Sequence, residues 1–90
     1  MTFYKISSEE LVWRVIDEEA VVMNLSNGAY YSLNRQGTII WNALVENNSS
    51  LDETVSSLIA QCDVDCDSAR KDVEELIEEL LTEKILVEKV

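Results

Sequence analysis

Few residues in this 90-residue chain could carry covalent or metal chemistry. The chain has no histidine, so it lacks the side chain that most often acts as a general base at neutral pH. Cys62 and Cys66 have no imidazole to activate them as nucleophiles, and two thiols are only half of a structural zinc site. We therefore expect two free thiols in a reducing compartment, with no metal and no cofactor. A redox pair or a shared metal site is the alternative.

Other common catalytic patterns are also missing. Glu74 and Glu78 are a carboxylate pair on a predicted helix, but carboxylates on a helix surface are usually solvated and take no part in catalysis or metal binding. Gly28 and Gly37 are isolated, so the chain has no glycine-rich phosphate loop. The sequence predicts a protein that is not an enzyme.

Ser68 permits one alternative function. It follows Asp67 at the start of a predicted helix in a small acidic chain, as does the phosphopantetheine attachment serine of acyl carrier proteins. Those carriers are helical bundles with a bulky apolar residue after the serine, whereas Ala69 follows here and the first third of the chain reads as strands. An acyl or peptidyl carrier modified at Ser68 stays open as an alternative.

The charge and hydropathy of the chain exclude further classes of partner. Its 18 acidic and 7 basic residues give a net charge of −11, which repels the phosphates of nucleic acids. No segment approaches the roughly 18 consecutive apolar residues of a membrane span. The segment from Met1 to Glu10 lacks the basic start and apolar core of a signal peptide. We expect a cytoplasmic protein with neither nucleic acid nor membrane as partner.

The elements that position any site begin with strands. The segments 11–16, 20–25 and 29–33 are rich in β-branched and aromatic residues. Turns are expected at Asp17–Glu19 and at Ser26–Gly28, where Asn-Gly supplies the positive φ angles of a tight hairpin. The sequence predicts a three-stranded antiparallel meander.

Three helices follow the predicted strands. The first is capped by Asn34 and ends near Val45, the second opens on a capping box from Ser50 to Glu53, and the third is capped by Asp65 or Asp67. The apolar positions of the third helix at helical spacing are Ala69, Val73, Leu76, Ile77 and Leu80. Its solvated face is expected to carry Lys71, Glu74, Glu75, Glu78 and Glu79.

Together these elements predict an α+β fold of the winged helix-turn-helix type: a three-stranded antiparallel sheet, three helices and a short C-terminal β-like tail from Ile85 to Val90. We expect a single domain over residues 1–90, with its core from 11 to 86. The third helix carries seven acidic and three basic residues between Asp67 and Lys84, so it cannot serve as a DNA-recognition helix.

Several segments of the chain resemble the PqqD-type proteins. The similarity includes the strand, turn and Tyr-Tyr pattern, then Leu-Asn and Ile-Trp, and extends from Leu11 to Leu86. The segments are Glu19–Asn34, Gly37–Trp41, Ser50–Cys62 and Asp72–Leu81. The chain departs from the family at Lys84–Leu86, where many members have Gly-Leu-Leu.

The resemblance implies a winged helix-turn-helix domain called a RiPP recognition element, which binds the leader of a ribosomally made precursor peptide and presents it to maturation enzymes. Members of about this length occur beside radical SAM enzymes, and beside the leader peptidase and cyclase of lasso peptide pathways. The length and Trp13 favour the lasso type. A winged-helix interaction module that does not bind DNA is a further alternative.

The third predicted strand lies at a sheet edge, where unpaired backbone groups can accept a peptide strand. We expect the peptide between this strand and the third helix, in contact with Ala29, Tyr30, Tyr31, Ser32, Leu33, Arg70, Lys71, Val73, Glu74 and Ile77. Several of these residues also have purely structural interpretations. Tyr31, Leu33 and Val73 fit core positions, and Arg70 can pair with Glu74 one helical turn away.

Overall fold

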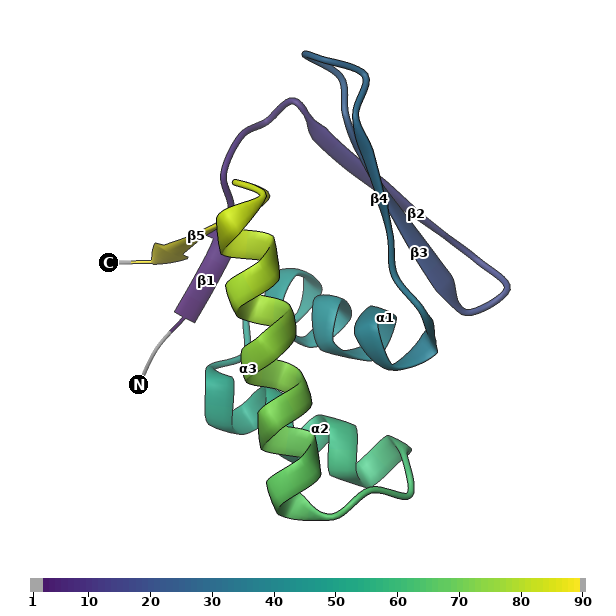
Figure 1. The fold of residues 1–90 in the computed structure, drawn as a ribbon, viewed down its shortest axis with the longest axis vertical. Helices are drawn as coiled ribbons and strands as arrows, with labels where there is room; N and C mark the ends of the chain where they lie inside the picture. Colours follow the sequence, from purple (N-terminus) through teal and green to yellow (C-terminus); the bar gives the residue numbers. More distant parts are fainter. Residues whose placement is uncertain (1–2, 90) are drawn as a thin grey trace.

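The computed structural model describes residues 3–89 and has an α+β architecture (Figure 1). Its elements in chain order are β1 (Phe3–Ile6), β2 (Leu11–Ile16), β3 (Glu19–Asn24), β4 (Tyr30–Ser32), α1 (Arg35–Trp41), the π-helical segment η1 (Asn42–Glu46), α2 (Leu51–Gln61), α3 (Cys66–Thr82) and β5 (Leu86–Lys89). The predicted three-stranded antiparallel sheet is confirmed, with the strand order β2-β3-β4, and so are the three helices that follow it. No helix within the described residues has both the length and the apolar character needed to cross a membrane.

The turn between β2 and β3 consists of two residues. Asp17 and Glu18 have φ angles of 52° and 67°, so both adopt the left-handed conformation of a primed hairpin turn. The sequence predicted a turn over Asp17–Glu19, but Glu19 already pairs with Ile16 as the first residue of β3.

The loop between β3 and β4 is wider than the predicted Asn-Gly turn. Only Gly28 is left-handed, with a φ angle of 77°. The side chain of Asn24 accepts a hydrogen bond from the Ser26 amide at 2.8 Å, and that of Asn27 accepts one from the Ala29 amide at 2.9 Å. These side-chain turns stabilise an irregular loop in place of a two-residue hairpin.

The helix starts agree with the predicted caps. Asn34 accepts a hydrogen bond from the Gly37 amide, Ser50 and Glu53 form the full capping box, and Asp65, not Asp67, accepts from the Ser68 amide at 2.7 Å. The predicted first helix, by contrast, does not remain α-helical to Val45. Beyond Trp41 the turns widen into η1, where the Asn47 amide bonds to the Asn42 carbonyl five residues earlier.

Helix α1 ties the helical layer to the sheet. The Thr38 hydroxyl, buried beneath β3, accepts a hydrogen bond from the Ala20 amide at 2.8 Å. Trp41 is fully buried, as the sequence predicted, and packs against Trp13 of β2. The core between the sheet, α1 and the two later helices consists of Leu11, Ala20, Val22, Leu33, Ile40, Trp41, Leu44, Val55, Leu58, Ala69, Val73, Ile77, Leu80, Ile85 and Leu86.

The β-like tail forms β5, which pairs with β1 and not with the three-stranded sheet. Phe3 lies opposite Lys89 and Ile6 opposite Leu86 in this antiparallel pair. In Figure 1 the β1–β5 pair lies on the left of α3 and the three-stranded sheet on its right. The sequence did not predict β1, because a four-residue strand whose partner is about 80 positions away has no local pattern of its own.

Candidate functional site

Strand β4 is an edge of the three-stranded sheet. In its pairing with β3, the Leu33 amide donates to the Ala20 carbonyl and the Ala29 carbonyl accepts from the Asn24 amide, both at 2.8 Å. In an antiparallel pair the bonded residues alternate along the strand. The backbone groups of Tyr30 and Ser32 therefore point away from β3, toward the open edge.

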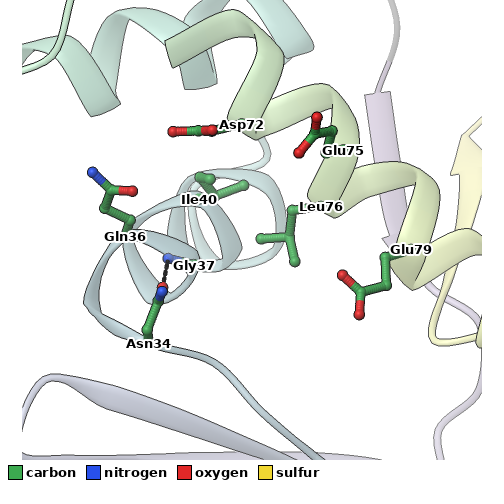
Figure 2. A pocket seen from close by; sticks show the side chains of 8 residues that line it. All are labelled: Asn34, Gln36, Gly37, Ile40, Asp72, Glu75, Leu76 and Glu79. Carbon is green, nitrogen blue, oxygen red and sulfur yellow. Dashed lines mark hydrogen bonds between the residues drawn. The ribbon is translucent and has the colours of Figure 1, made fainter. Parts of the chain in front are cut away.

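Two separate pockets lie along the space between α3 and the segment from β4 to the α1 start, and we call them together the cleft. Its upper part, about 140 Å³, is lined by Leu11, Val22, Asn24, Asn27, Ala29, Tyr30, Tyr31, Glu83 and Ile85. Its lower part, about 210 Å³, lies between the α1 start and the middle of α3 (Figure 2). The residues that line this lower part are Asn34, Gln36, Gly37, Ile40, Asp72, Glu75, Leu76 and Glu79. Figure 1 shows that β4 and α3 run in opposite directions.

Tyr31 bridges the two walls of the cleft. Burial is the main cause that raises the pKa of its hydroxyl, followed by a hydrogen bond to the Glu79 carboxylate and by the negative charges of Glu79 and Glu83. Tyr31 is therefore neutral at physiological pH and acts as a hydrogen-bond donor to α3.

The α3 wall of the cleft is acidic. Asp72, Glu75 and Glu79 border the lower part, and Figure 2 shows all three on the side of α3 that faces the α1 start. Glu83 continues the series at the upper part. Leu76 supplies an apolar surface between the carboxylates, together with Ile40 from α1.

The strand residues predicted for the site lie as expected along the edge. Tyr30 is 71% exposed, Tyr31 is half-buried and Leu33 is buried, which confirms the core position expected for Leu33. Ala29 and Leu33 flank β4 and continue its hydrogen bonding to β3.

Most of the helix residues predicted for the site lie on other faces of α3 than the one that borders this cleft. Arg70 pairs with Asp52 of α2 at 2.8 Å, not with Glu74, and Val73 is fully buried. Glu74 and Ile77 border a separate cavity beside Tyr4, Leu51 and Leu81. Lys71, which forms a 4.0 Å ion pair with Glu75, is the one predicted helix residue adjacent to the cleft.

Sequence reasoning did not assign the cleft residues of α3 to the site. It predicted solvated positions for Glu75 and Glu79, and both residues are exposed. The cleft residues of α3 and its C-terminal end are at positions 72, 75, 76, 79 and 83, beside the buried stripe of Val73, Ile77 and Leu80. The usable signal was Leu76, an apolar residue at the border of that stripe that is only partly buried.

Other candidate groups take no part in this cleft. Cys62 is half-buried and Cys66 exposed, and both are unpaired. Among residues 3–89 no three His, Cys, Asp or Glu side chains are grouped so that they could hold a metal ion. Ser68, the residue of the carrier alternative, lies in the first turn of α3, where its amide bonds to Asp65.

Comparison with known proteins places this architecture in a family. The family model described as coenzyme PQQ synthesis protein D (PqqD) matches residues 19–86. Among curated proteins there is no match.

Two solved structures are similar over nearly the whole chain. One, described as TbiB1 in complex with the TbiA(beta) leader peptide, has 30% sequence identity and a TM-score of 0.81, with 91% of this chain and 93% of that chain covered. The other, a lasso peptide synthetase B1 complexed with the leader peptide, has 19% identity and the same TM-score, with coverage of 93% and 96%, and it shows the shared fold. With the family model matched from β3 to β5, the chain belongs to the PqqD family.

Proposed function

We propose that this chain is a RiPP recognition element that binds the leader segment of a ribosomally synthesised precursor peptide by strand addition to β4. It then delivers the peptide to maturation enzymes. The leader peptidase and cyclase of a lasso peptide pathway are the favoured partners, and a radical SAM enzyme is the next. The observation that carries the proposal is the open edge of β4, where the backbone groups of Tyr30 and Ser32 face away from β3 and Tyr30 borders the upper part of the cleft.

The relative with 30% identity supports this assignment, since its structure contains a leader peptide. In the proposed complex, the N–H and C=O groups of Tyr30 and Ser32 bond to the leader backbone, and Ala29, Tyr31 and Leu33 hold the strand in register. The side chains of the leader contact the α3 wall around Leu76, in place of the wall predicted from Arg70, Val73, Glu74 and Ile77.

The free energy of leader binding requires contributions from both the β4 edge and the α3 wall of the cleft. About four backbone hydrogen bonds at roughly 0.5–1.5 kcal/mol net stabilise the complex by only a few kcal/mol, whereas micromolar binding needs about 8 kcal/mol. The cleft side chains must supply the difference, because an isolated edge strand has no pocket to select a peptide.

The proposal extends to the remaining properties of the chain. We infer a single domain over residues 1–90 of the winged helix-turn-helix type, in which α2 and α3 form the helix-turn-helix and the β2–β4 sheet packs beside it. We further infer a cytoplasmic binding module that has no catalytic activity of its own. The Ser68 carrier alternative lacks comparable support, because the family match and the similar structures point to leader binding.

The decisive experiment begins with a search of the neighbouring genes for a short precursor peptide. Its leader is made as a set of labelled peptides, each with one N-methylated residue, and each peptide is titrated against the protein. Strand addition requires that methylation weakens binding at alternate positions only, because every second amide of an added strand faces β4. A loss at consecutive positions, or at none, would refute strand addition.

A further inference from the structure

The cleft beside β4 carries a charge pattern that the proposed function does not explain. Asp72, Glu75, Glu79 and Glu83 line its α3 side from the lower to the upper part. Within residues 3–89, only Glu75 among them has an ion-pair partner, Lys71, at 4.0 Å with both side chains exposed. The cleft therefore presents several carboxylates without a cation of the same chain to neutralise them.

The spacing of these carboxylates matches that of a peptide strand. Glu75, Glu79 and Glu83 are four residues apart, which corresponds to about 6 Å along the axis of a helix. Alternate side chains of a β-strand are about 6.6 Å apart. Because β4 and α3 run in opposite directions (Figure 1), a strand added to the open edge of β4 passes along α3. Its alternate side chains then meet successive carboxylates.

The acidic side chains add selectivity to the binding site proposed at the open edge of β4. We infer that this chain selects leader segments with Lys or Arg at alternate positions, i and i+2, on the face of the added strand that is turned toward α3. This inference rests on the proposed function. The apolar surface of Leu76 and Ile40 then takes the apolar side chain next along the same face. Charge-assisted hydrogen bonds in such a cleft are stronger than those of neutral pairs.

The overall charge of −11 is a competing explanation, since it attracts any basic peptide. The two explanations differ in the distance over which the charges must act. At about 300 mM salt the Debye length falls to roughly 6 Å, so distant acids are screened while contacts within the cleft persist. Glu74 and Glu78 border the cavity on the other side of α3, so they provide a matched control with the same change in net charge.

The test is a selection from random peptides of about 16 residues displayed on phage, carried out at about 300 mM salt. The baits are the wild-type chain, Glu79→Gln/Glu83→Gln and the control Glu74→Gln/Glu78→Gln. Binders are accepted only if they are lost on Ser32→Pro, which ties them to the β4 edge. We expect Lys and Arg pairs two positions apart to be enriched about threefold or more with the wild type and the control, and not with the cleft variant.

A charge-reversed bait strengthens the test. Glu79→Lys/Glu83→Lys should select Asp and Glu at the same alternate positions. Binders that depend on Ser32 but show no Lys or Arg preference would overturn the charge inference and leave strand addition standing. Equal loss of the preference in the control would also overturn it, because overall charge would then be the cause. A selection without any Ser32-dependent binder would refute the proposed function itself.

Discussion

Trp13 of β2 and Trp41 of α1 meet edge to face, with ring centroids 5.4 Å apart and ring planes inclined at 75°. The Trp13 indole N–H also donates a 2.9 Å hydrogen bond to Glu46 Oε1 at the end of η1. One half-buried side chain thus connects the sheet to two successive helical segments. Since the sheet carries the β4 edge, this connection fixes the position of that edge relative to α1 and η1.

Trp13→Ala should lower the free energy of unfolding by about 2 kcal/mol, because it removes the aromatic pair and part of the surface that covers Trp41. Urea unfolding followed by circular dichroism measures the change. Glu46→Gln keeps a hydrogen-bond acceptor and should change stability by less than about 0.5 kcal/mol. A Trp13→Ala protein as stable as the wild type would show that the sheet is held by other contacts.

Ser32→Pro should weaken leader binding at least about tenfold while the fold is retained, because the amide that it removes points to the open edge and makes no bond to β3. Anisotropy of a labelled leader measures the affinity, and circular dichroism checks the fold. The matched control Ser32→Ala keeps the amide and should bind within about 0.5 kcal/mol of the wild type. Unchanged affinity in folded Ser32→Pro would place the site elsewhere.

Leu76→Ala should reduce leader affinity about tenfold, since it removes apolar surface from the cleft wall. Arg70→Ala breaks only the exposed pair with Asp52, so its affinity and stability should each stay within about 0.5 kcal/mol of the wild type. Calorimetric titration of both variants compares two faces of one helix. A larger loss for Arg70→Ala would restore the helix face first expected from the sequence.

Lys84→Gly should stabilise the protein by about 0.5–1 kcal/mol. Lys84 follows α3 with a φ angle of 61°, a conformation that costs a side-chain-bearing residue energy and that glycine adopts freely. Thermal unfolding should show a rise in Tm. Glu83 has a φ angle of −78°, so Glu83→Gly should lower the Tm by the usual helix-end penalty of glycine. A fall in Tm for Lys84→Gly would contradict this account.

The stability of the protein should fall as the pH rises above about 10. The pKa of Tyr31 is raised in the folded state by burial, by the Glu79 hydrogen bond and by nearby acidic charge. Its contribution is therefore complete below the unfolded pKa of about 10 and is lost at higher pH. Tyr31→Phe should reduce the fall in the free energy of unfolding between about pH 9.5 and 11, as measured by urea unfolding.

The sequence was informative where local chemistry decides the structure. Ser50 with Glu53, and Asn34 before Gly37, are start signals whose hydrogen bonds form within a few residues. It failed where tertiary contacts decide. No local pattern reveals that Phe3–Ile6 pairs with a strand at the other end of the chain.

In the candidate site, too, local signals could be read from the sequence and tertiary contacts could not. The β4 edge could be predicted because hairpins determine the order of neighbouring strands. The cleft wall could not, because periodicity identifies the buried stripe of α3 around Val73 but not which border of that stripe faces β4. Glu79 is exposed, as predicted, but the sequence did not show that its carboxylate accepts a hydrogen bond from Tyr31.

The pairing of β1 with β5 brings the beginning and the end of the described chain to one place, with Phe3 directly opposite Lys89. A protein whose ends adjoin tolerates circular permutation, and it also tolerates insertion into a surface loop of a host protein. A short linker across this pair, with new termini opened at the loop of residues 47–49, would keep every element of the fold. The described fold could thus be inserted as a single unit into a host enzyme, which would then carry the proposed peptide receptor.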